Sequence, residues 1–240
     1  MDLQVVIDAL PAMLEGTVLT IEITLISVVI GLCLAIPSAF GRLSGNPFVW
    51  MPTYVFILYF RGTPFLVQLF LVYYGSGQFR EVLQSLGLWV FFREAYFCAV
   101  FTLTLNTAAY TAEILRGAIQ AVPRGEIEAA RACGMSGLLL YRRIVFPKAF
   151  RLALPAYGNE VVFLLQTTSL VSVITLLDLT GVAGRMVAKT FAVYELYIAA
   201  ALIYLVLTFT VTRIFKWMEF RFSGHLRERP KQKLEILTPH

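Results

Sequence analysis

The residues of this sequence that are best suited to chemistry do not combine into a catalytic site. The two histidines, His225 and His240, both lie near the C-terminus, so no buried base stands beside a serine or an acid. The three cysteines are far apart, and their spacing suits neither a disulfide framework nor a metal cluster. The P-loop pattern G-x-x-x-x-G-K-S/T is also missing. We therefore expect a protein that is not an enzyme and that binds no metal and no cofactor of its own.

The most charged internal stretch is residues 125–147, which separates two long apolar segments. Two acids, Glu126 and Glu128, stand where the first turn of a helix would place them favourably in the helix dipole. Gly134 suits the left-handed conformation that often ends a helix. The pattern predicts a short helix that ends at Gly134, a second short amphipathic segment, and a new element that begins at Pro147. The residues that we single out are Glu126, Glu128, Ala129, Ala130, Arg131, Gly134, Ile144 and Pro147.

A second unusual stretch, Arg61-Gly62-Thr63-Pro64, interrupts the apolar run 50–74. A charge, a glycine and a proline are costly inside a membrane unless they have a role. Pro64 removes one backbone hydrogen bond and is expected to kink the helix. Arg61 needs an acid, backbone carbonyls or water as a partner. We expect a structural or gating motif; the alternative is a kinked helix whose arginine extends toward the membrane surface.

Polar side chains are dense in two further apolar runs, 96–115 and 152–175, and sparse in the first and last ones. They either line a path for a solute or form the interhelical hydrogen bonds that are common in membrane bundles. We carry the path forward as a hypothesis. The candidate path residues are Asn106, Tyr110, Asn159, Glu160, Gln166 and Thr167.

Two acids, Glu113 and Glu160, stand in or beside this candidate path. Glu113 shares a helix face with Asn106, because the two are seven positions apart. An unpaired acid within a membrane is costly. Each acid either attracts a cationic solute or pairs with Arg61 or Arg116, and the sequence leaves both possibilities open.

These polar groups depend for their positions on the apolar segments that carry them. Hydrophobic residues make up 58% of the 240 residues, above the roughly 45–50% of a soluble domain. The apolar runs are long enough to cross a membrane as helices. We expect an all-α membrane protein with one membrane domain over residues 1–221, loops at 75–94 and 176–194, and a basic tail over 222–240. The five predicted spans are 17–40, 50–74, 96–115, 152–175 and 195–215.

The distribution of lysine and arginine predicts the orientation. With five spans, most of these residues fall on the side of the charged stretch 125–147, which the positive-inside rule makes cytoplasmic. The N-terminus is then outside, and the tail is inside and faces anionic lipid headgroups. The net charge of +5 is explained in this way without nucleic acid as a partner.

Two motifs resemble those of a known family. The charged stretch has the pattern E-A-A, three residues, G, nine residues, I-x-F-P, and it resembles the EAA loop of permease subunits of type I ABC importers, with Phe146 at a position where the family usually has leucine. The segment F-R-G-T-P-x-x-V-Q resembles a conserved region of polar amino acid permeases. The stretches L-N-T-A-A-Y-T-A-E-I and L-P-A-Y-G-N-E-V are most similar to the histidine, lysine, arginine and ornithine type or the octopine and nopaline type.

This resemblance implies a multi-pass subunit of the bacterial inner membrane. The EAA loop would be a coupling helix that docks on a cytoplasmic ATPase subunit, and that subunit would bind ATP and magnesium. The other partners would be a second permease subunit and a periplasmic substrate-binding protein that delivers a polar amino acid, of the basic class, or an opine. Many relatives have Lys-Asp-Ser-Ser where residues 166–169 read Gln-Thr-Thr-Ser, so a sister permease could hold the charged side chain of the substrate.

Two other classes of membrane protein stay open from the residues themselves. A secondary transporter would show internal repeats with broken helices at matching positions, and no repeat is found here. A membrane scaffold subunit that does not transport would have no use for a coupling loop.

Overall fold

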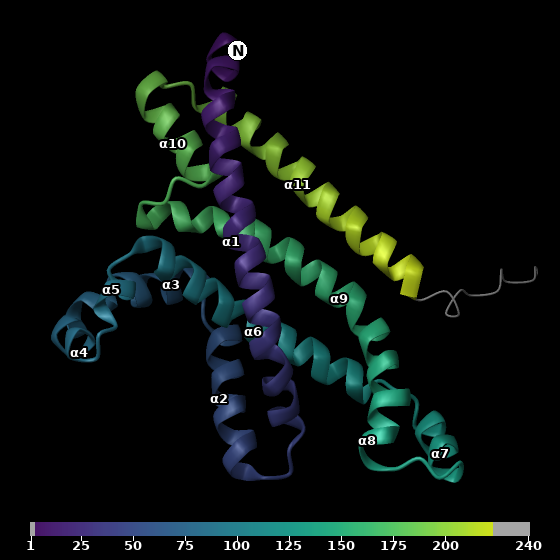
Figure 1. Ribbon diagram of the computed structural model, residues 1–240. Helices are drawn as coiled ribbons and strands as arrows, with labels where there is room; N and C mark the ends of the chain where they lie inside the picture. The colour runs from purple at the N-terminus through teal and green to yellow at the C-terminus, as the bar shows by residue number, and fades with distance from the viewer. Residues whose placement is uncertain (1–2, 223–240) are drawn as a thin grey trace, which may run out of the picture.

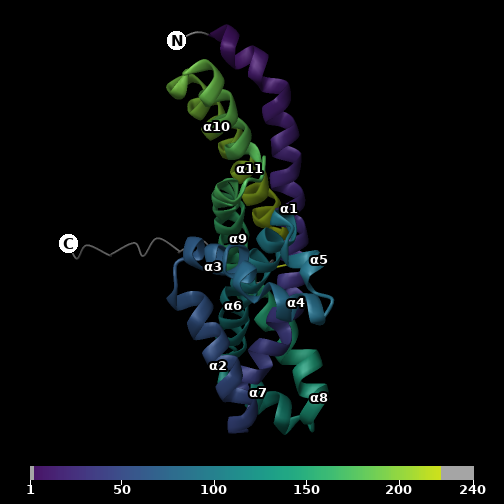
Figure 2. The same ribbon diagram turned by 90° about the vertical axis from the view of Figure 1, so that its left-hand side faces the viewer.

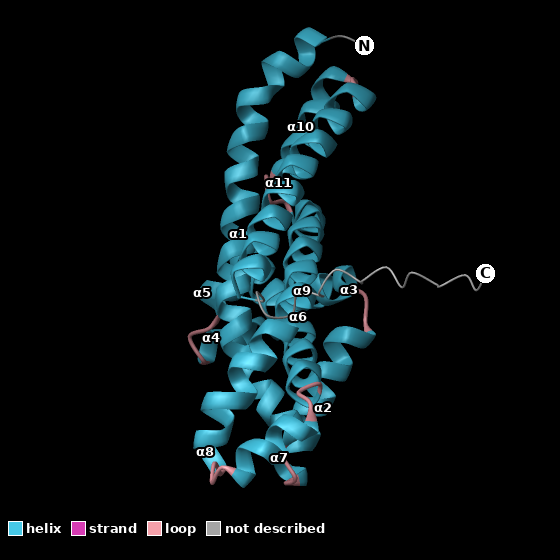
Figure 3. Cartoon of the chain, turned by 90° about the vertical axis from the view of Figure 1, so that its right-hand side faces the viewer, coloured by secondary structure: helices cyan, strands magenta, loops and turns pink. Residues whose placement is uncertain are grey.

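The computed structural model describes residues 3–222, and every regular element in that range is a helix (Figure 3). The all-α prediction is therefore confirmed, whereas the predicted basic tail lies, apart from Phe222, outside the described residues. The helices in chain order are α1 (Leu3–Leu43), α2 (Pro47–Gly62), α3 (Phe65–Tyr73), η1 (Gly75–Phe79), α4 (Arg80–Ser85), α5 (Trp89–Phe92), α6 (Ala95–Gln120), α7 (Arg124–Ala132), α8 (Gly137–Leu140), η2 (Tyr141–Val145), α9 (Phe146–Thr167), η3 (Thr168–Ile174), α10 (Leu179–Thr190) and α11 (Val193–Phe222).

Within the described range, two helices are long and apolar enough to cross a membrane, namely α1 with 41 residues and α11 with 30. The number rises to four if each of two bent helix pairs counts as one span. One pair joins Pro47–Gly62 to Phe65–Ser85 at 107°, and the other joins Gly137–Ile174 to Leu179–Thr190 at 46°. The helix α6 carries buried polar residues, which lower its hydropathy although they face the protein interior.

The molecule is elongated, and α1 runs along most of its length (Figures 1 and 2). The N-terminal end of α1 lies beside α10, and the opposite end of the molecule holds α7, α8 and the start of α2. Helix α1 packs along α6, α6 packs against α9, and α9 packs against α11. At the crossing of α1 and α6, a Cβ atom at Gly31 would lie 2.5 Å from Thr107 Cγ2. The two helices approach this closely only because position 31 has no side chain.

The segment around Pro64 forms a break, where the sequence predicts only a kink. Helix α2 ends at Gly62 and α3 begins at Phe65, with Thr63 and Pro64 extended between them. Thr63 takes the extended backbone that a following proline favours. The next predicted loop, 75–94, is folded into the short helices η1, α4 and α5.

The prediction of a loop at 176–194 is wrong, because this segment contains α10. Asp178 caps α10, since its carboxylate accepts from the backbone N–H groups of Gly181 at 3.0 Å and Thr180 at 3.3 Å. Leu179, Val182 and Ala183 are buried against α1 and α11. Their spacing of three and four is the period of an amphipathic helix, which was present in the sequence.

Candidate functional site

The helix predicted in the charged stretch is α7, and it ends where the sequence places its end. Gly134 is left-handed, with a φ of 81°. The N–H of Gly134 donates to the carbonyl of Arg131 at 2.9 Å, and the N–H of Met135 donates to the carbonyl of Ala130 at 3.0 Å. This pair of bonds is a Schellman motif, which satisfies carbonyls at the end of the helix. The predicted conformation of Gly134 is thereby confirmed.

One face of α7 is fixed to the rest of the protein, and the other is open. Ala130 is buried and Ile127 partly so, in an apolar cluster that contains Ala118 and Val122 from the end of α6 and Ala149 from α9. Glu126 also forms an ion pair with Lys148 on α9. These contacts tie α7 to the end of α6 and the start of α9. Outside this packed side, α7 exposes Glu128, Ala129 and Arg131. We call the surface formed by these three residues the α7 face.

The remaining residues singled out in the charged stretch, Ile144 and Pro147, lie outside α7. Ile144 is half-buried in the same apolar cluster and belongs to η2, a single π-helical turn. Pro147 is exposed and stands in the first turn of α9, which begins one residue earlier, at Phe146. Proline is favourable there because the first turn of a helix has no intrahelical partner for its N–H groups.

The break between α2 and α3 is held by two buried amides. Gln68 Nε2 donates to the carbonyls of Phe60 at 2.9 Å and Thr63 at 3.0 Å, and to Thr63 Oγ1 at 2.8 Å. Asn106 Nδ2 donates to the Phe60 carbonyl at 3.2 Å and to Gln68 Oε1 at 3.0 Å. These bonds satisfy carbonyls that the end of α2 leaves without an intrahelical partner. The predicted path residue Asn106 is thus buried and committed to the break, and Gln68 is a structural residue that the sequence analysis did not single out.

The other predicted path residues divide into accessible and buried ones. Asn159 and Gln166 are exposed on α9, and Tyr110 on α6 is half-buried, with its ring centroid 6.4 Å from that of Phe163. Glu160 is 7% exposed and accepts a hydrogen bond from Thr107 Oγ1 at 3.1 Å. No ion pair joins Glu160 to a residue of the described range. A buried carboxylate with one hydroxyl donor is costly to hold in a membrane.

The last two path candidates, Gln166 and Thr167, are neighbours in the chain but differ in their surroundings. Thr167 is buried, and its hydroxyl donates to the carbonyl of Phe163 at 2.8 Å. Gln166 lines a cavity of about 390 Å³ between the end of α9 and α11, together with Ser169 and Tyr204.

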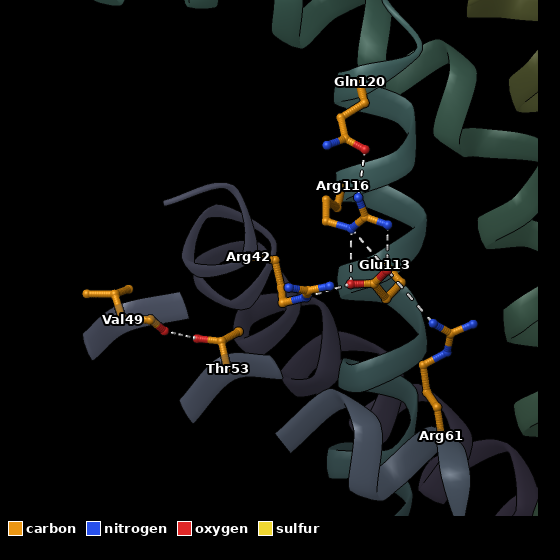
Figure 4. A network of polar contacts seen from close by, with 7 residues as sticks. All are labelled: Arg42, Val49, Thr53, Arg61, Glu113, Arg116 and Gln120. Atoms are coloured by element: carbon orange, nitrogen blue, oxygen red, sulfur yellow. Dashed lines mark hydrogen bonds and ion pairs between the residues drawn. The ribbon is translucent and has the colours of Figure 1, made fainter. Parts of the chain in front are cut away.

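Glu113 is the centre of an ion-pair cluster (Figure 4). Arg116, one turn along α6, reaches it with its nearest nitrogen at 2.8 Å, and Arg42 Nε from the end of α1 lies at 3.2 Å. Arg61 Nη1 from α2 is more distant, at 3.9 Å. Of the two possibilities that the sequence left open, Glu113 takes the pairing with arginines. Arg42 is far away in the chain, and no spacing signal connects it with Glu113.

A cavity of about 300 Å³ adjoins this cluster, lined by Arg42, Tyr54, Ile57, Leu58, Arg61, Gly62, Tyr110 and Glu113. The guanidinium carbon of Arg42 lies 4.8 Å from the centroid of the Tyr54 ring, and that of Arg61 lies 5.2 Å from the centroid of the Tyr110 ring. The predicted motif residues Arg61 and Gly62 therefore line a cavity, whereas Thr63 and Pro64 form the adjacent break.

Comparison with known proteins defines the class. The chain belongs to the family described as the binding-protein-dependent transport system inner membrane component, whose model matches residues 27–224. The family resemblance predicted from the sequence is thereby confirmed. Membership also argues against the secondary transporter and the scaffold as alternatives.

Several relatives are similar over most of their length. The nopaline transport system permease protein NocM of Agrobacterium fabrum is 49% identical over 229 residues, which are 95% of each chain. The octopine permease protein OccM of Rhizobium meliloti is 46% identical over 87% of this chain and 85% of its own. The histidine/lysine/arginine/ornithine permease protein HisM of Escherichia coli K12 is 42% identical over 88% of this chain and 89% of its own. All three are named as permeases of transport systems and not as enzymes.

Solved structures of ABC transporters contain chains with a similar fold. A solved amino acid ABC transporter with histidines contains a chain that is 34% identical, with a TM-score of 0.82 over 92% of this chain and 99% of that one. A chain of the methionine transporter MetNI is 16% identical with a TM-score of 0.66, which shows the fold alone.

Proposed function

We propose that this chain is the permease subunit of an ATP-driven importer that takes up basic amino acids or opines. The observation that carries this proposal is α7, a short helix that is locked to α6 and α9 on one side and open on the other. Such a helix can pass a movement from a cytoplasmic ATPase to the helices that bear the polar residues. The names of the similar permeases, which concern nopaline, octopine and the basic amino acids, support the substrate class.

The proposed topology has five crossings, made by α1, by α2 with α3, by α6, by α9 and by α11. Helix α6 is included although its hydropathy is low, because Thr102, Asn106 and Thr107 are buried inside the protein and do not face lipid. The N-terminus then lies outside, and α7 lies inside a bacterial inner membrane, which agrees with the distribution of lysine and arginine.

The proposed partners follow from this orientation. The α7 face contacts an ATPase subunit, which holds the ATP and magnesium. The opposite end of the molecule, where α10 lies, faces a periplasmic substrate-binding protein (Figure 1). A second permease subunit, identical or homologous, completes the translocation path.

For the path itself, the accessible groups Tyr110, Asn159 and Gln166 are proposed to contact the solute. Glu160 and Thr167 stand behind them, and Asn106 shapes the path by holding the break between α2 and α3. Glu160 favours a cationic solute, because this buried acid forms no ion pair within residues 3–222.

The test is uptake by the complete importer in proteoliposomes, with its own binding protein and ATP inside. We expect uptake of at least one among labelled arginine, lysine, histidine, ornithine, octopine and nopaline, and no uptake with a non-hydrolysable ATP analogue. A sugar or an inorganic anion that is transported in place of all six solutes would contradict the proposed substrate class.

A further inference from the structure

The cavity between α2 and α6 carries more positive than negative charge. Three guanidinium groups, those of Arg42, Arg61 and Arg116, surround the single carboxylate of Glu113 (Figure 4). Glu160 on α9 forms no ion pair with Arg61, and its carboxylate accepts from Thr107 instead. Among the described residues, three guanidinium groups therefore stand within 4 Å of one carboxylate.

Of the three arginines, Arg61 is the one whose N–H groups make no hydrogen bond to the described residues. Both oxygens of Glu113 already accept from Arg116, and Oε1 also accepts from Arg42. Arg61 reaches Glu113 only at 3.9 Å, which is an ion-pair contact without a hydrogen bond. Its side chain is 43% exposed and makes no hydrogen bond to the residues that the structure describes. The five N–H donors of this guanidinium are thus available to a ligand.

The surroundings of Arg61 keep these donors in place. The ring of Tyr110 lies beneath the guanidinium, with the carbon 5.2 Å from the ring centroid. Arg42 is held in the same way by Tyr54 and Trp50, at 4.8 and 5.2 Å. The cavity that both arginines line measures about 300 Å³, which is at the small end of ligand sites. A small ligand would enter it with its charged group beside Arg61 and its apolar part against Ile57 and Leu58.

We propose that this cavity binds an oxyanion, through a bidentate contact between the Arg61 guanidinium and a carboxylate or phosphate group. The planar fork of arginine matches two oxygens of such a group, and charge-assisted hydrogen bonds of this kind are the strongest that side chains form. Bound there, the oxyanion neutralises the surplus charge next to the break between α2 and α3.

Two sources offer this chemistry. One is the carboxylate of a transported amino acid, an alternative that rests on the proposed function. The other is the headgroup of an anionic lipid, since basic pockets between membrane helices bind such headgroups.

The experiment measures how fast an arginine-specific reagent, phenylglyoxal, modifies Arg61 in the purified importer complex without its binding protein. The modified peptides are quantified by mass spectrometry, and Arg93, whose side chain is 55% exposed, is the internal control. Acetate, L-arginine and agmatine, which lacks the carboxylate, are added in phosphatidylcholine nanodiscs. A parallel series uses nanodiscs that contain phosphatidylglycerol.

At a ligand concentration of about three times Kd, modification of Arg61 should slow about fourfold, because a quarter of the sites stay free. Protection by acetate and L-arginine but not by agmatine supports the solute carboxylate as the source. Protection by phosphatidylglycerol alone supports the lipid. Equal rates in every condition, protection by agmatine as strong as by L-arginine, or no reaction of Arg61 without ligand would overturn the proposal. Labelling requires no uptake, so failure of the uptake experiment would leave this result interpretable.

Discussion

Replacing Gly134 with valine is expected to abolish ATP-driven uptake while the protein still inserts into the membrane. The φ of 81° at this position suits glycine, and a β-branched residue held there costs about 1–3 kcal/mol of backbone strain. A Cβ atom at Gly134 would meet no other atom within 4 Å, so the substitution acts through the backbone and not through a clash. The strain is relieved if the Schellman motif opens, and α7 then loses the orientation of its exposed face.

Gly125 provides the matched control for this prediction. It stands in the first turn of the same helix, is exposed, has no positive φ, and has no atom within 4 Å of an added Cβ. Gly125→Val should therefore keep most of the uptake measured in proteoliposomes. Equal uptake by the two variants would show that the end of α7 does not matter for coupling.

The second large effect is expected from Glu113→Gln, which should destabilise the folded protein by about 3–5 kcal/mol, as when one partner of a buried ion pair is removed. The substitution keeps the size of the side chain but removes a carboxylate that lies within 4 Å of three arginines. The side chains of Glu113 and Arg42 are only 14% and 13% exposed, so water screens the remaining charges poorly. The measurement is the midpoint of thermal unfolding of the purified protein in detergent.

Glu94→Gln is the control for charge removal alone. Glu94 pairs with Arg93 at 3.1 Å, but their side chains are 61% and 55% exposed. An exposed pair of this kind contributes about 0–1 kcal/mol, so the midpoint should hardly change. If Glu113→Gln were as mild as Glu94→Gln, the cluster would not hold α1, α2 and α6 together.

The features that the sequence predicts correctly are local ones. The end of α7 follows from one residue, because glycine at that position needs no distant partner to adopt a left-handed conformation. The interruption of the helix at Pro64 also follows from local sequence, but the angle between the two helices does not. The angle of 107° depends on Gln68 and Asn106, which bind carbonyls that the break exposes.

The features that escape prediction depend on contacts between distant segments. Arg42 and Glu113 are 71 positions apart, so only the packing of α1 on α6 brings them together. Polar residues of α6 were expected to face a path because polarity alone does not distinguish a water-filled path from a buried hydrogen bond, as Asn106 illustrates. Helix α10 was missed for a different reason, since its polar residues made a short amphipathic helix resemble a loop.

We propose that the ATPase subunit docks on the α7 face. The most direct test of this docking places the photo-crosslinking amino acid benzoylphenylalanine at Ala129, which is exposed on that face, in the intact importer within membranes. The control position is Lys189 on α10, which is also exposed and lies at the opposite end of the molecule (Figure 2). Illumination should join the Ala129 variant to the ATPase subunit and leave the Lys189 variant without that product. An ATPase adduct from Lys189, or none from Ala129, would show that the ATPase subunit does not dock on the α7 face.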